Sequence, residues 1–129
     1  MPLRLAYFIR ADATASTVPG ECLEPLARDG RDTHAYHLYI VRIDPEQAGG
    51  TRDEYAALLD EEGIATSIHF LPVHTLTAYR DLLDEPPDLP VAERAGGDVL
   101  SLPLSPAHSE EAIAEVVTAL RRVHGRLVK

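Results

Sequence analysis

The chain has 129 residues and a mass of 14.1 kDa, and 45% of its residues are apolar. This length suits one domain, with a core that buries about two thirds of the surface that the unfolded chain exposes. The formal net charge of −9 repels phosphate backbones, and no Lys/Arg cluster interleaved with aromatic residues offsets it. We therefore expect no nucleic-acid partner.

Cysteine content and hydropathy indicate the cellular compartment of the protein. Cys22 is the only cysteine, so no disulfide can form within the chain, which fits a reducing environment. No apolar run approaches ~18 residues, and the start at Met1 lacks the long apolar centre of a signal peptide. The sequence therefore predicts a cytoplasmic protein with no membrane partner.

Residues 1–33 form a stretch that we interpret as an N-terminal arm of uncertain structure. Leu3 to Ile9 are apolar enough for a short strand, although their alternation is blurred. Small and polar residues dominate positions 10–33, and Pro19-Gly20 indicates a turn. This composition predicts a mobile arm or irregular packing.

A second region, residues 34–129, has the patterns of a folded domain. Residues 34–43 alternate with apolar side chains on both faces, which predicts a central strand ended by Asp44-Pro45. Thr51 and Glu54 have the spacing of a capping box, and the helix that they open is predicted to run to Glu62. Gly63 stands where a helix commonly ends.

The stretch after Gly63 alternates as a strand would, from Ile64 to Phe70, until Pro72 removes a ladder hydrogen bond. Two short helices are then predicted, from Leu76 to Leu83 and from Pro90 to Arg94, the second ended by the Gly96-Gly97 pair. His69 and His74 lie on either side of the break at Pro72, in a strand-end loop of the kind that often carries function.

The last elements are a strand over Val99 to Leu102 and a helix capped by Ser109. That helix has an apolar stripe, and its final turn carries His124 among arginines, where cations are favourable. The complete order predicts an α+β fold, in which a small three-stranded sheet is covered on one side by two longer helices.

The residues from Gly63 to Tyr79 resemble a known family signature. Gly-Ile-x-Thr-x-x-His-Phe-x-Pro-x-His-x-x-x-x-Tyr is similar to the small domain of the DegT/DnrJ/StrS family of PLP-dependent (fold-type I) nucleotide-sugar aminotransferases. Three flanking pieces agree in order and spacing: His34-Ala-Tyr-His-Leu-Tyr-Ile-Val-Arg, Arg52-Asp-Glu, and Val99-Leu-Ser-Leu-Pro-Leu-Ser-Pro. The resemblance runs from Thr33 to Val123 and implies a small sheet with helices on one face, as in the carboxy-terminal third of a usual family member. Separately, the preference for Arg over Lys and the many alanines hint at a bacterial source.

The resemblance also implies that the chain lacks the cofactor half of such an enzyme. A PLP aminotransferase holds its cofactor on a buried lysine. The only lysine here is Lys129, at the end of a polar tail. In the family, the lysine belongs to a large domain that precedes the part matched here. We therefore expect no catalytic and no cofactor-binding residue in this chain, with PLP bound only in the full-length family.

For substrate binding, the resemblance nominates His69, His74 and Tyr79, because the family's loop lies toward the mouth of the active site. The alternative is that these are surface or hinge residues retained by descent. A metal site built from His34, His37, His69 and His74 is disfavoured, because His34 and His37 would point to opposite faces of a strand.

Other chemistry finds little support in the sequence. We interpret His37 as a core histidine, and His124 as a helix-end residue. The serines, Ser67 and Ser101 among them, lack a Gly-x-Ser-x-Gly elbow and have no base beside them in sequence.

Three functional readings stay open at this point. The first is a truncated or split aminotransferase small domain that is not competent alone. The second is a non-enzymatic binding or regulatory module, and the third is a subunit that completes a PLP enzyme in trans with a separately encoded large domain. A lost large domain would leave an exposed apolar face, which would recruit that domain or drive self-association unless residues 1–33 cover it.

Overall fold

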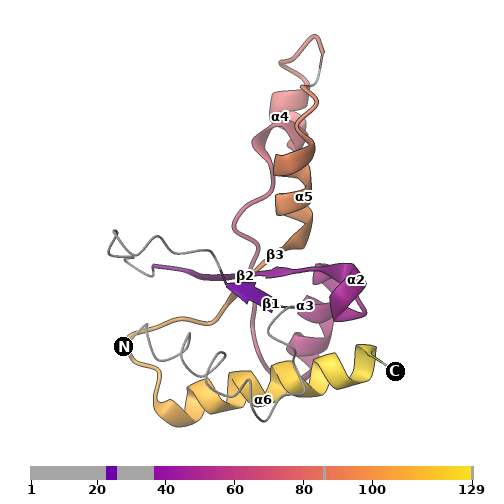
Figure 1. Ribbon diagram of the computed structural model, residues 1–129. Helices are drawn as coiled ribbons and strands as arrows, with labels where there is room; N and C mark the ends of the chain where they lie inside the picture. The colour runs from indigo at the N-terminus through magenta and orange to yellow at the C-terminus, as the bar shows by residue number, and fades with distance from the viewer. Residues whose placement is uncertain (1–22, 26–36, 86, 129) are drawn as a thin grey trace, which may run out of the picture.

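The computed structural model describes residues 23–25, 37–85 and 87–128. In chain order these form β1 (Leu23–Pro25), β2 (Tyr39–Ile43), α2 (Pro45–Ala48), α3 (Arg52–Glu61), the 3-10 helix η2 (Val73–Thr75), α4 (Thr77–Arg80), α5 (Pro90–Asp98), β3 (Val99–Leu102) and α6 (Glu110–Leu127). The architecture is α+β, as the sequence predicts: a small sheet is packed against helices, and a helical hairpin extends away from it (Figure 1).

The sheet is antiparallel throughout, in the order β1-β2-β3, so β2 is central. Tyr39 pairs with Leu102 and Val41 with Leu100, and these four side chains are buried on one face. The strands differ from those expected. β1 falls within residues 10–33, where we expected irregular structure, whereas the expected strand from Leu3 to Ile9 lies outside the described residues.

The strand expected from Ile64 to Phe70 is wrong. The only pairing of this segment within the described residues is one bridge, in which the Ser67 N–H donates to the Ser101 carbonyl (3.1 Å) and the Ser101 N–H donates to the Ser67 carbonyl (2.8 Å). Ile68 is 38% exposed and Phe70 is 72% exposed. Alternation stabilises a strand where one face is buried, and here Ile64 is half-buried against the core but no side chain from Ile64 to Phe70 is fully buried.

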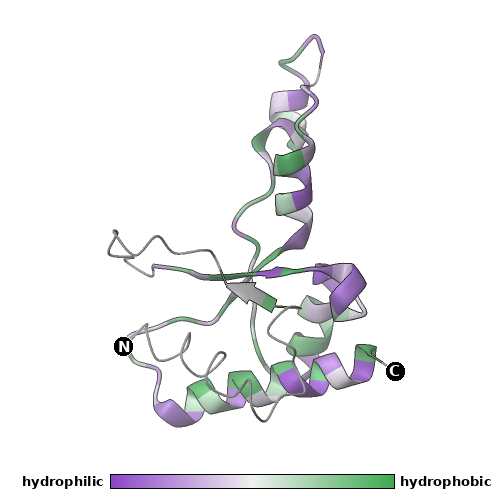
Figure 2. Cartoon of the chain, viewed as in Figure 1, coloured by the Kyte–Doolittle hydropathy of each residue, from purple (hydrophilic) through white to green (hydrophobic). Residues whose placement is uncertain are grey.

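Helices α3 and α6 cover one face of the sheet (Figure 1). Tyr55 and Leu59 of α3 and Val123 of α6 are fully buried between helix and sheet. Figure 2 shows the apolar residues of α6 gathered on the side toward the sheet. This amphipathic stripe explains why the expected final helix is confirmed over its full length.

The caps of both long helices form as expected. The Thr51 hydroxyl accepts from the Glu54 N–H (3.3 Å), and the Glu54 carboxylate accepts from the Thr51 N–H (2.7 Å). Gly63 then follows α3 with φ of 78°, in the left-handed region that favours glycine. At α6 the Ser109 hydroxyl accepts from the Ala112 N–H. These signals are local in sequence, so they could be identified without the fold.

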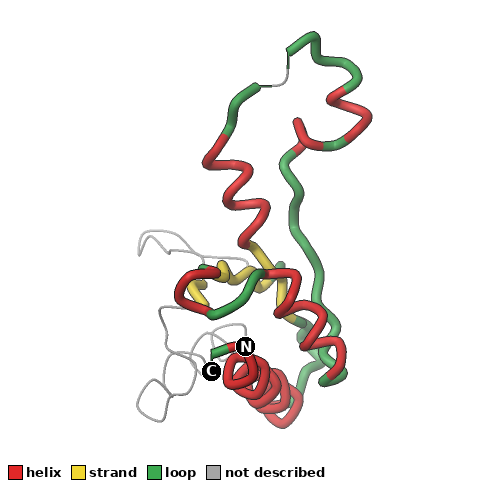
Figure 3. The backbone as a smooth tube through the Cα atoms, turned by 90° about the vertical axis from the view of Figure 1, so that its right-hand side faces the viewer, coloured by secondary structure: helices red, strands yellow, loops and turns green. Residues whose placement is uncertain are grey.

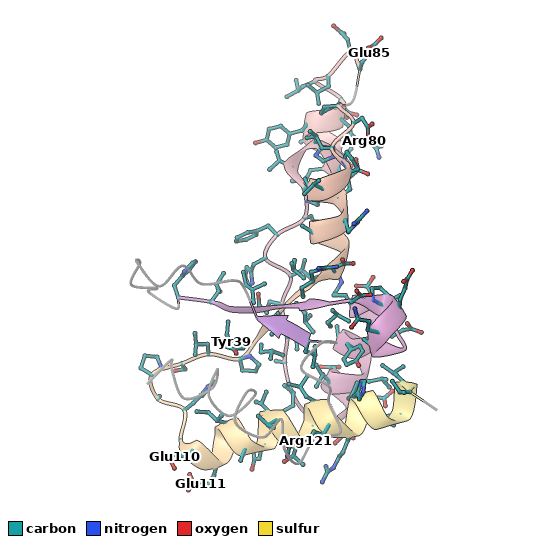
Figure 4. All side chains as sticks on the ribbon, viewed as in Figure 1. Tyr39, Arg80, Glu85, Glu110, Glu111 and Arg121 are labelled. Carbon is teal, nitrogen blue, oxygen red and sulfur yellow. The ribbon has the colours of Figure 1, made fainter. Side chains whose placement is uncertain are left out.

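Residues 68–85 and 87–98 form a projection that rises from the sheet on the side opposite α6 (Figure 3). Within it, α5 runs through Gly96 and Gly97 and meets β3 directly, so the helix stop expected at these glycines is wrong. Arg80 and Glu85 lie toward the far end of the projection, whereas Glu111 lies at the start of α6 (Figure 4). No helix in the described part of the chain has the length and apolarity to cross a membrane.

The interior contains His124, which we expected to be a cation at a helix end. His124 is only 4% exposed, and its Nδ1 lies 2.8 Å from the Tyr55 hydroxyl. The Tyr55 hydroxyl in turn donates to the Ala48 carbonyl (3.1 Å). Burial lowers the pKa of His124 below its ordinary value, so the side chain is a neutral hydrogen-bonding group, and the interpretation of a helix-end cation is wrong.

Candidate functional site

His69 lies where the projection leaves the sheet, two residues after the Ser67 bridge. Its Nδ1 is 2.8 Å from the Ser101 hydroxyl, in the middle of β3. Its ring also meets the Phe70 ring edge to face, with centroids 4.8 Å apart. The Ser101 bond fixes the imidazole orientation and leaves Nε2 for another partner, and no such partner is found among the described residues.

A hollow of about 170 Å³ opens beside His69. Its walls come from the start of β2, the segment before the projection and the end of β3, and comprise His37, Leu38, Ala65, Ser67, His69, Ser101, Leu102, Pro103 and Leu104. His37 is exposed here, so the interpretation of a core histidine is wrong. Two imidazoles and two hydroxyls in an otherwise apolar wall suit a ligand with hydroxyl or anionic oxygens.

The other two nominated residues lie elsewhere. His74, in η2, places Nε2 3.0 Å from the Glu93 carboxylate of α5, and its side chain is only 11% exposed. Tyr79 lies in α4 and is 50% exposed. Neither lines the hollow, so His69 is the only nominated residue among its walls.

The projection is attached to the body through the base of α5. A side-chain carbon on Gly96 would lie 2.7 Å from Cγ of Pro72, and nearer still to its Cδ, so the Pro72 ring packs against the bare glycine. Arg52 of α3 is 7% exposed and donates from Nη1 to the carbonyls of Gly96 (3.1 Å) and Val99 (3.2 Å). The half-exposed Arg42 adds an ion pair to Asp98 (3.3 Å).

Sequence reasoning missed three partners that define this region: Ser101 for His69, Glu93 for His74, and the Gly96 carbonyl for Arg52. They are separated by 32, 19 and 44 positions respectively, so no local pattern could have revealed them. The Ser101–His69 pair is a serine beside a base, but Ser101 is 5% exposed within a strand, which suits positioning of the imidazole rather than nucleophilic attack.

The described residues include no lysine that could hold PLP as a Schiff base. The single lysine of the sequence is Lys129, which lies outside the described residues. Among the described residues, no group of three or more His, Cys, Asp or Glu side chains could hold a metal ion.

The sequence was compared with protein families and with known proteins. The sequence model of the DegT/DnrJ/EryC1/StrS aminotransferase family matches residues 14–121. The spore coat polysaccharide biosynthesis protein SpsC of Bacillus subtilis is 39% identical over 108 residues, which cover 82% of this chain and 27% of SpsC.

Two solved structures have the same fold. DesI, solved in the presence of its TDP-sugar product, is 28% identical with a TM-score of 0.80, over 97% of this chain and 31% of DesI. Spr1654 of Streptococcus pneumoniae, described as a sugar aminotransferase and solved in its PLP form, is 23% identical with a TM-score of 0.78, over 99% of this chain and 31% of that protein. The chain thus spans about a third of the length of these proteins or less, and it belongs to the DegT/DnrJ/EryC1/StrS aminotransferase family.

Proposed function

We propose that this chain is the small domain of a DegT/StrS-type sugar aminotransferase and is not catalytically competent by itself. The observation that carries the proposal is the absence of a lysine other than Lys129 in a chain that matches the family over residues 14–121. Without a buried lysine amine, no Schiff base with the cofactor can form. PLP, which binds Spr1654, would therefore have to be held by another polypeptide segment.

The proposed contribution of this chain is to contact the substrate. His69, His74 and Tyr79 would face a nucleotide sugar, and DesI, with its TDP-sugar product, supports this substrate class. In the hollow, the Nε2 of His69 and the Ser67 hydroxyl are suited to sugar hydroxyls or phosphate oxygens. His74 and Tyr79 would contribute from the projection, at a distance from the hollow.

The partner that we propose is a large PLP-binding domain, with self-association as the alternative use of the same surface. All the exposed large hydrophobic residues found among the described residues, except Val128, belong to the projection. An apolar surface of this kind commonly marks an interface. Packing against a large domain would cover it and would bring the missing lysine to the nucleotide-sugar site.

The test is to purify the chain, add PLP, reduce with borohydride and measure the intact mass, alone and after mixing with the large domain of SpsC expressed separately. We expect no adduct on the chain alone, and transamination of a nucleotide sugar only in the mixture. A specific PLP adduct on the isolated chain, together with turnover, would overturn the proposal. Tight binding of a protein partner without any need for PLP would favour a non-enzymatic binding module instead.

A further inference from the structure

We propose that Arg52 is a positioning residue that holds the projection, and with it the loop from His69 to His74, in place against the sheet. The effect that we expect on substrate binding rests on the proposed function, because the loop from His69 to His74 is where we place substrate contacts. The structural part of the inference concerns only the described residues of this chain and can be tested separately.

Arg52 occupies a rigid and nearly water-free position. It is the first residue of α3, and the Thr51–Glu54 capping box fixes the backbone on which it stands. Its side chain is 8% exposed and also forms an ion pair with Asp53. A buried guanidinium must have its donors satisfied, so it holds its partners in a narrow range of positions.

Those partners are the carbonyls at the point where α5 becomes β3. The Gly96 carbonyl lies in the last turn of α5, where backbone carbonyls find no N–H donor within the helix and must accept a hydrogen bond from elsewhere. The Val99 carbonyl opens β3. A cation at a helix carboxy terminus is also favoured by the helix dipole. One nitrogen of Arg52 therefore fixes the angle at which the projection leaves the sheet.

Two contacts connect α5 to the loop from His69 to His74, so a change in the position of α5 would move the loop. The Pro72 ring lies directly against Gly96, and His74 bonds to Glu93 one turn earlier on α5. A second polar connection joins α5 to the sheet, the Arg42–Asp98 pair, in which the Arg42 side chain is 41% exposed and the Asp98 side chain is 13% exposed. Because its cation is accessible to water, this pair should hold α5 less firmly than the buried donors of Arg52 do. Loss of the Arg52 donors should therefore release the projection while the helix-covered core stays intact.

The experiment measures the distance between spin labels on α5 and α6. Cysteines replace the exposed residues Val91 and Glu115, and Cys22 is changed to Ser. We expect one narrow distance distribution for the labelled protein that keeps Arg52. Arg52→Met keeps the apolar stem but has no donors, so its distribution should be shifted and broader. Arg52→Lys restores a donor and should recover the narrow distribution. Arg122→Met, which removes only the exposed pair to Glu62, is the matched control and should leave the distribution unchanged.

Circular dichroism separates positioning from folding. A folded Arg52→Met variant with the distribution of the parent protein would overturn the inference. If Arg52→Met does not fold, the Lys variant decides: it must retain the narrow distribution, and a broad one in a folded Lys variant contradicts the donor role.

Catalytic measurements on the mixture with a large domain test the consequence. There we expect Arg52→Met to raise KM for the nucleotide sugar more than it lowers kcat, because the loop is displaced and not removed. If the unsubstituted chain gives no turnover in any mixture while the distances behave as expected, the proposed function fails and the positioning role of Arg52 stands. If turnover occurs and the distances do not respond, the positioning role fails alone.

Discussion

The Tyr55 hydroxyl connects α3, where Tyr55 lies, to α2 and α6. It donates to the carbonyl of Ala48, the last residue of α2, and it lies within hydrogen-bond distance of His124 in α6. Tyr55→Phe leaves both partners buried without that oxygen. We expect a loss of about 1–3 kcal/mol in the free energy of unfolding, measured by urea denaturation, as for other buried groups deprived of a partner. Tyr79→Phe, at a half-exposed position in α4, is the control and should change stability by less than about 0.5 kcal/mol.

The imidazole of His124 makes stability depend on pH. Burial lowers its pKa below the ordinary value of 6.5, so between those two values the unfolded chain binds more protons than the folded one. Its contribution to stability is therefore complete above 6.5 and is lost as the pH falls toward the folded pKa. We expect urea midpoints to decrease from about pH 7.5 to about pH 5.5.

His124→Gln tests the source of this dependence. The variant should show a shallower decrease over the same interval, because glutamine cannot titrate. His108→Gln, in the loop before α6, serves as the control and should keep the parent slope. Equal slopes for the parent and His124→Gln would show that the buried imidazole is not responsible.

At the scale of elements, the two adjacent glycines of α5 should respond in opposite directions. A methyl group at Gly96 would collide with the rigid Pro72 ring, whereas one at Gly97 would meet nothing within 4 Å. We expect Gly96→Ala to destabilise by about 1–3 kcal/mol, as overpacked sites do. Gly97→Ala should stabilise by roughly 0.5–1 kcal/mol through helix propensity. Thermal unfolding of the two variants gives the comparison, and a stabilised Gly96→Ala would contradict the close packing.

These glycines also show where sequence reasoning ends. The caps at Thr51 and Ser109 depend on neighbours three residues away, so they were predicted correctly. The glycine pair has the local signature of a helix stop, yet α5 continues through both residues, and Gly96 instead provides the bare backbone against which the Pro72 ring packs. Similarly, the alternation after Gly63 is that of a strand, but burial, which sequence does not supply, decides whether the strand forms.

In the candidate site too, local sequence signals could be predicted, and contacts between distant residues could not. The motif around His69 indicated the loop, and the structure places that residue in the wall of a hollow. The partners Ser101 and Glu93 come from β3 and α5, which only the fold brings near. β1 escaped prediction for a related reason: three residues carry too little pattern, and the strand exists because β2 offers a free edge.

At the scale of the whole molecule, the projection determines how the chain meets other molecules. Leu82 is 79% exposed and Val91 is 82% exposed, and they belong to the set of apolar residues that the helices of the body leave uncovered. We expect the isolated chain to associate with itself as its concentration rises, and Leu82→Ser with Val91→Ser to shift sedimentation-velocity profiles toward the monomer. The unfolding midpoint should barely move, because exposed side chains contribute little to the core.

Val128→Ser provides the control, since Val128 is 50% exposed but lies after α6, away from the projection. It should leave association unchanged. If the doubly substituted projection associates as strongly as the parent chain, another surface is responsible. If association weakens and binding of an added large domain weakens in parallel, the two processes compete for one face, because a single apolar surface can be covered by only one partner at a time.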